Sequence, residues 1–122
     1  MKNKYGAKKQ QYQGMTFDSK GELARYIELE DLQRAGIIKD LERQIPLHIT
    51  HNGIKICKYI ADFCYKENDL IVYEDFKGVE TDVFNLKKKL VKAFFDIDIL
   101  VTKKITQKKK RSFEALITSG PM

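Results

Sequence analysis

The dipeptide Asn52-Gly53 limits the possible folds of this chain more than any other local feature of its sequence. Both central positions of a tight hairpin turn need a positive φ, which Asn and Gly adopt at low cost. We therefore expect the β-like segments 37–50 and 54–65 to pair as antiparallel strands. Pro46 lacks a backbone N–H, so it is expected at a sheet edge or a bend.

The rest of the predicted fold follows from the segments after this hairpin. A polar turn at 66–69 leads into a third strand at 70–77, which completes an antiparallel meander. Apolar residues at helical spacing predict helices at 19–35 and 81–95. The strand at 97–101 is expected beside 70–77, because the helix between them supplies a crossover connection. The predicted fold class is α/β, with a mixed central sheet of the meander plus the crossover strand, flanked by helices.

The formal net charge of +6 is distributed unevenly along the 122 residues. Residues 1–11 read as a flexible basic arm and residues 103–122 as a basic C-terminal tail, on either side of one domain at 12–102. Such arms suit phosphate backbones, but they equally suit solubilising tails. The candidate nucleic-acid contacts in the two ends are Lys8, Lys9, Lys108, Lys109, Lys110 and Arg111.

The sequence contains no apolar run that approaches the roughly 20 residues needed to span a bilayer. Its basic N-terminus also leads into polar residues rather than the apolar core of a signal peptide. We therefore expect a soluble cytoplasmic protein that makes no use of a membrane.

The triplet Asp75-Phe76-Lys77 is the most informative chemical feature. Side chains alternate between the faces of a strand, so Asp75 and Lys77 should share one face. Asp62 lies in a strongly apolar stretch of the preceding strand, where a carboxylate is costly unless it is bound or paired. Pairing about the intervening turn places Asp62 roughly opposite residues 72–75.

Two such carboxylates can hold a hard divalent cation, and a lysine beside them can stabilise a phosphate or orient a water. This combination is suited to phosphodiester hydrolysis. Acid-x-Lys triplets are nevertheless common as solvent-facing ion pairs. Glu74 remains an alternative ligand, because a slip of one residue in the pairing would exchange it with Asp75.

The segments around these residues resemble a known signature. Residues 59–63 and 73–78 resemble the PD-(D/E)XK pattern of restriction-endonuclease-like nucleases, and residues 17–22 resemble the N-terminal helical motif of that class. The chain is also similar to a family of small phage-encoded proteins of uncharacterised function. The resemblance covers residues 12–102. No Pro precedes Asp62, where the named signature has one.

The resemblance implies a restriction-endonuclease-like core and gives roles to four residues. Asp62 would be the central metal ligand, Asp75 the second acid and Lys77 the catalytic lysine. Glu22 would be a further acid that reaches the metal, which is Mg²⁺ with Mn²⁺ able to substitute. The alternative for Glu22 is a capping-box carboxylate bonded to the backbone N–H of Ser19.

The second predicted helix carries several lysines, of which Lys87 and Lys88 are the first candidates for phosphate contacts near the site. The alternative is that they form the solvated face of an amphipathic helix. His48 and His51 flank the predicted hairpin and are expected at the surface.

These features predict a Mg²⁺-dependent phage or prophage DNA endonuclease that acts in the cytoplasm of a bacterial host cell. Branched DNA, including Holliday junctions, is a candidate substrate, and junction resolution would require a homodimer. Phage replication or recombination proteins are candidate partners. Two alternatives stay open: a non-catalytic nucleic-acid-binding module, and an accessory protein of phage DNA replication or recombination.

Overall fold

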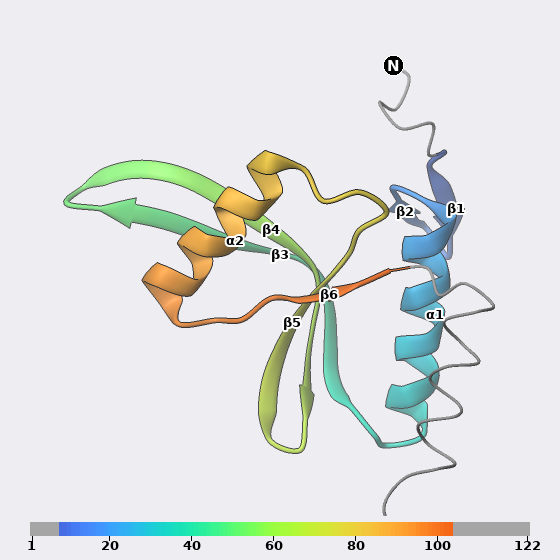
Figure 1. Ribbon diagram of the computed structural model, residues 1–122. Coiled ribbons are helices and arrows are strands. Elements are labelled where there is room, and N and C mark those ends of the chain that lie inside the picture. The colour runs from blue at the N-terminus through green and yellow to red at the C-terminus, as the bar shows by residue number, and fades with distance from the viewer. Residues whose placement is uncertain (1–7, 104–122) are drawn as a thin grey trace, which may run out of the picture.

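A computed structural model describes residues 8–103 as a mixed α/β fold (Figure 1). A four-stranded sheet has the order β3-β4-β5-β6, and a small separate sheet pairs β1 with β2. The elements are β1 (Gln10–Tyr12), β2 (Met15–Phe17), α1 (Lys20–Arg34), β3 (Lys39–His51), β4 (Ile54–Glu67), β5 (Leu70–Phe76), α2 (Asp82–Phe95) and β6 (Leu100–Thr102).

The larger sheet is mixed, as the sequence predicts. Strands β3, β4 and β5 form an antiparallel meander, and β6 lies parallel to β5 after the crossover through α2. Asn52 and Gly53 have φ values of 52° and 76°, so the predicted tight turn is confirmed. Pro46 lies on β3, which is an edge strand of this sheet.

Both predicted helices are confirmed, and each is capped by its own sequence. The Ser19 hydroxyl accepts from the Glu22 N–H at 3.1 Å at the start of α1, and the Thr81 hydroxyl accepts from the Phe84 N–H at 3.1 Å at the start of α2. Gly36, with φ +80°, follows the end of α1 in the left-handed conformation that ends many helices. Neither helix within residues 8–103 is long and apolar enough to cross a membrane.

Two segments differ from the prediction. A β1–β2 hairpin forms across Gln13 and Gly14 and begins at Gln10, inside the segment that the sequence predicts as a flexible arm ending at residue 11. Three-residue strands are too short to show a periodic pattern. The last strand begins at Leu100 rather than residue 97, because Ile97 and Ile99 pack into the core before the pairing with β5 starts.

The sheet has two separate hydrophobic clusters. Leu29 of α1 packs with Phe63 and Tyr65 of β4, whereas Phe84 and Val91 of α2 pack with Tyr59 and Ala61 of the same strand. The helix that packs on the buried residues of β4 therefore changes at Asp62, from α2 before it to α1 after it. On β3, the register places Gln44 opposite this position, between Arg43 and Ile45, and its φ of 53° is left-handed. The candidate site lies where the sheet changes its covering helix.

Candidate active site

Asp62 and Asp75 face each other across the end of the β4–β5 ladder. The last backbone pair is Phe63 with Glu74, so continuing the same register sets Asp62 opposite Asp75. At this position the two carboxylates accept the backbone hydrogen bonds that carbonyl groups accept elsewhere in the ladder. The Asp62 N–H donates to Asp75 Oδ1 at 2.8 Å, and the Phe76 N–H donates to Asp62 Oδ2 at 2.9 Å. Each carboxylate is thus fixed by the backbone of the other strand.

The carboxyl group of Asp75 is almost completely buried, with 1% of the residue exposed. Its second oxygen, Oδ2, has no hydrogen-bond partner among residues 8–103. Burial raises the pKa of Asp75 to about 6, and the Asp62 N–H and the charge of Lys77 oppose this rise. Burial also raises the pKa of Asp62 against the hydrogen bond from Phe76. These two acids are costly to ionise without a further positive partner.

Glu22 brings a third carboxylate from the first turn of α1, and it is 3% exposed. Its Oε1 accepts from the Asp18 N–H at 3.3 Å. This resembles the capping alternative, although the donor is Asp18 rather than Ser19. The other oxygen, Oε2, has no hydrogen-bond partner within the described residues. Burial and the negative charge of Asp62 raise the pKa of Glu22 to about 7, so Glu22 is electrostatically coupled to the Asp62 end of the pair.

Lys77 follows β5 directly, and its backbone N–H donates to the Thr102 carbonyl at 2.9 Å. Its Nζ lies 4.7 Å from the centroid of the Phe84 ring on α2. The positive charge of Lys77 lowers the pKa of both Asp62 and Asp75, which places the ammonium beside the acid pair. Its side chain is therefore on the α2 side of the sheet.

Arg43 is a member of this cluster that the sequence reading did not identify. Its Nη2 lies 3.8 Å from Glu22 Oε2 and donates to the Thr16 carbonyl at 2.8 Å. The guanidinium carbon lies 3.9 Å from the centroid of the Phe17 ring. The sequence could have indicated this, because side chains alternate along a strand and Arg43 lies two positions before Ile45. Both residues therefore point toward the interior.

Glu74 lies on the opposite face of the sheet, so the structure does not bring it together with Asp62. Arg25 donates to both Glu74 oxygens, from Nε at 2.6 Å and from Nη2 at 3.0 Å. The hydroxyls of Tyr65 and Thr102 donate to the same carboxylate at 2.6 and 3.0 Å. Glu74 is 0% exposed, and its oxygens are occupied by this network. Glu74, the alternative metal ligand if the pairing slipped by one residue, is therefore held in a buried ion pair with Arg25.

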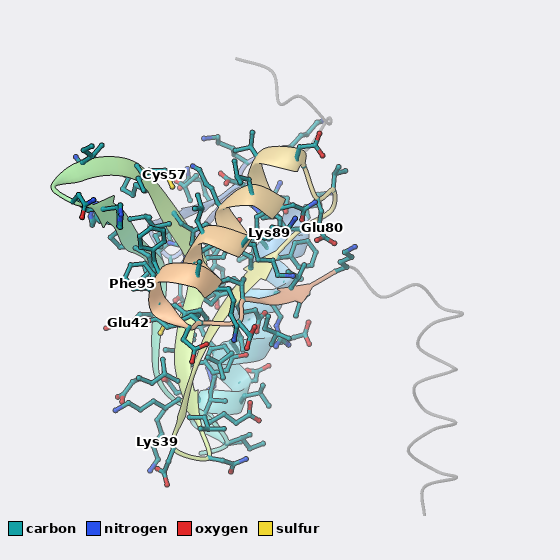
Figure 2. All side chains as sticks on the ribbon, turned by 60° about the vertical axis from the view of Figure 1, so that its left-hand side comes forward. Lys39, Glu42, Cys57, Glu80, Lys89 and Phe95 are labelled. Atoms are coloured by element: carbon teal, nitrogen blue, oxygen red, sulfur yellow. The ribbon has the colours of Figure 1, made fainter. Side chains whose placement is uncertain are left out.

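The predicted phosphate contacts are spread more widely. Lys87 Nζ donates to the Lys58 carbonyl at 3.1 Å, which ties α2 to β4. Lys88 and Lys89 line an open hollow of about 400 Å³ on the flank of α2, where Figure 2 labels Lys89. Lys8 and Lys9 are exposed before β1. The remaining candidates, Lys108, Lys109, Lys110 and Arg111, lie outside the described residues.

The donor set fits a hard divalent cation in its chemistry. Carboxylate oxygens are the ligands that Mg²⁺ and Mn²⁺ prefer, and two of those present, Asp75 Oδ2 and Glu22 Oε2, are buried without a hydrogen-bond partner in residues 8–103. No three His, Cys, Asp or Glu side chains in that part of the chain are already arranged to hold a metal ion. Asp62 and Asp75 are thus already fixed beside each other, whereas the Glu22 carboxylate would have to move toward this pair to bind the same ion.

Comparison with known proteins places the chain in a family. A family model described as "Protein of unknown function (DUF1064)" matches residues 2–112. No curated protein and no solved structure matches the chain. Because the family match covers nearly the whole sequence, this protein belongs to the DUF1064 family.

Proposed function

We propose that this protein is a Mg²⁺-dependent nuclease that hydrolyses phosphodiester bonds in DNA. The observation that carries the proposal is the interlocked pair Asp62 and Asp75, with Lys77 beside it. One buried oxygen of Asp75 has no hydrogen-bond partner in the described part of the chain. The order of helix, meander, helix and parallel strand is also compatible with the restriction-endonuclease-like core and the PD-(D/E)XK site that the sequence resembles.

The residues of the chain divide the work between them. Asp62 and Asp75, with Glu22 as a third acid, would hold Mg²⁺ or Mn²⁺. The bound ion supplies a positive charge that neutralises phosphate oxygens and makes a water more acidic. The Lys77 ammonium, kept in place by the Phe84 ring, can donate hydrogen bonds to the scissile phosphate or to the attacking water. Arg43 offsets part of the acid charge from the other side.

The biological setting belongs to the same proposal. A phage or prophage enzyme in a bacterial cytoplasm would meet branched replication and recombination intermediates, and a homodimer would present two sites to a junction. The proposed roles of replication or recombination proteins as partners rest on the sequence resemblance alone.

The test is a cleavage assay on linear duplex, single-stranded and four-way-junction DNA with Mg²⁺, Mn²⁺ or EDTA. We expect metal-dependent cutting of at least one substrate. Asp75→Asn and Lys77→Met should each lower the rate by about 10²- to 10⁴-fold. Asp98→Asn is the matched control, because Asp98 is an exposed acid held by Lys92 on the far end of α2. Equal cleavage by Asp75→Asn and wild type would refute the assignment.

Two observations favour a second candidate function, a nucleic-acid-binding module without catalysis. No three-ligand metal cluster is preformed in residues 8–103, and the neutral forms of Glu22 and Asp75 are stabilised by burial. Binding of all three DNA substrates, with no cutting under either metal, would select this function over the nuclease.

A further inference from the structure

The outer half of the β3–β4 hairpin is a two-stranded ribbon, formed by residues 45–51 and 54–61. The pairing of β5 with β4 reaches only as far as Phe63, so these residues pair with each other and with no further strand among the described residues. Figure 1 shows the hairpin projecting beyond the end of α2. The inner end of the ribbon, at Ala61, adjoins Asp62 of the candidate active site.

The two faces of the ribbon differ. Tyr59, Ala61 and Ile49 point to one face, where α2 covers them. Ile60 alternates with these residues, so it points to the other face, where it is 43% exposed. Ile56 has no partner at the register shift between Ile49 and Thr50, and it is 45% exposed. The face opposite α2 is therefore a partly apolar strip that no described element covers.

The charge of the ribbon shows what kind of occupant the strip suits. Residues 44–61 contain no Asp or Glu, although the domain as a whole is acidic. Lys55 and Lys58 are exposed on β4. Lys87 of α2 donates to the Lys58 carbonyl from the side that α2 covers, so the edge of the ribbon is cationic as well. A polyanion complements this surface. A second copy in a two-fold dimer would bring the like-charged strips together, which is unfavourable.

We propose that this ribbon binds duplex DNA on one side of the phosphodiester bond that is cut, an inference that rests on the proposed function. A two-stranded β-ribbon fits the major groove of B-DNA. Lys55 and Lys58 contact the phosphates that border the groove. Ile56 and Ile60 meet apolar base edges such as thymine methyl groups. The bound duplex then runs from the hairpin turn toward Asp62.

The experiment measures binding of a fluorescein-labelled linear duplex by anisotropy in EDTA, using the full chain with Asp75→Asn so that no cleavage occurs. Removing two phosphate contacts at about 0.1 M salt costs roughly sixtyfold in affinity, since each contact releases close to one counterion. We expect this roughly sixtyfold loss of affinity for the double variant that carries Lys55→Gln and Lys58→Gln, called the ribbon pair. The slope of log K against log salt should fall in magnitude by about 2.

The matched control is Lys20→Gln with Lys39→Gln, two exposed lysines outside the ribbon. Figure 2 shows Lys39 at the opposite end of the molecule from Cys57, which lies on the ribbon. The control pair should keep wild-type affinity and salt slope. Equal losses in both pairs, or no loss in the ribbon pair, would overturn the proposal.

Two further measurements separate the alternatives. If Ile60→Ser dissolves a wild-type dimer in sedimentation velocity and leaves DNA affinity unchanged, a second copy covers the strip and the proposal is wrong. The cleavage assay reports on the active site alone. Normal cleavage with unaltered binding by the ribbon pair overturns only the ribbon assignment. Absence of cleavage by wild type, with binding lost in the ribbon pair, overturns the nuclease and retains DNA binding by the ribbon.

Discussion

Replacing Asp75 by Asn should change how the stability of the metal-free protein depends on pH. Burial raises the pKa of this carboxyl from 3.8 to about 6. An acid with a higher pKa in the folded state binds more protons there, so its contribution to stability is largest at low pH. That contribution is lost as the pH rises from the pKa of the unfolded state through the pKa of the folded state. Glu22, raised from 4.5 to about 7, acts in the same direction.

The size of the effect follows from the shift. One pKa unit corresponds to about 1.4 kcal/mol, so the full shift of Asp75 is worth about 3 kcal/mol in the free energy of unfolding. About 2 kcal/mol of this falls between roughly pH 4.5 and pH 8. In Asp75→Asn this component is absent, while the amide oxygen can still accept from the Asp62 N–H. The variant should therefore have a pH profile flatter by about 2 kcal/mol.

The assay is urea unfolding in EDTA at both pH values, followed by circular dichroism. Asp98→Asn is the control, because the Asp98 side chain is 84% exposed and should leave the profile unchanged. With Mg²⁺ at about ten times its dissociation constant, wild type should gain about 1.4 kcal/mol at the higher pH and Asp75→Asn should gain nothing. A variant profile as steep as that of wild type would refute the burial argument. An equal Mg²⁺ gain in both proteins would refute Asp75 as a ligand.

Two further predictions concern the framework that holds the site. Arg25→Met leaves the buried Glu74 carboxylate without its cation, so the free energy of unfolding measured in urea should fall by about 3–5 kcal/mol, and Arg25→Lys should recover part of it. No loss for Arg25→Met would contradict the ion pair. Gly21→Ala places a Cβ in steric conflict with the Phe76 ring, so it should cost about 1–3 kcal/mol by the same measurement. The control is Ala24→Ser on the exposed side of α1, because Gly14→Ala would add strain at a positive φ. An equal loss of stability in Ala24→Ser would contradict the steric reason.

Local chemistry was sufficient to predict most of the secondary structure. Asn52-Gly53 favours a tight hairpin turn, because these two residue types adopt the required positive φ values at low cost. Ser19 and Thr81 start the two helices by hydrogen bonds to residues only three positions away. The β1–β2 hairpin was missed because its strands are three residues long and have no readable period.

The arrangement of the acids depended on contacts between distant segments. The turn after β4 uses Asn68 and Asp69 in left-handed conformations, and this register sets Asp62 against Asp75 and sends Glu74 to Arg25. A shift of one residue would have exchanged the two acids, because side chains alternate along a strand. The acid-x-Lys spacing alone could not exclude that exchange.

The sequence by itself determined the turn at Asn52-Gly53, where the two helices start, and that an acid lies in an apolar strand at Asp62. Those properties depend on residues that are neighbours along the chain. Only the tertiary structure decided that Glu22 keeps one oxygen without a hydrogen-bond partner among residues 8–103, and that Arg43 lies 3.8 Å from this oxygen. It also decided that β3 and β4 extend past the site as an acid-free ribbon. These features depend on how α1 and the strands pack against one another, and no local pattern encodes a distance between elements that are far apart in sequence.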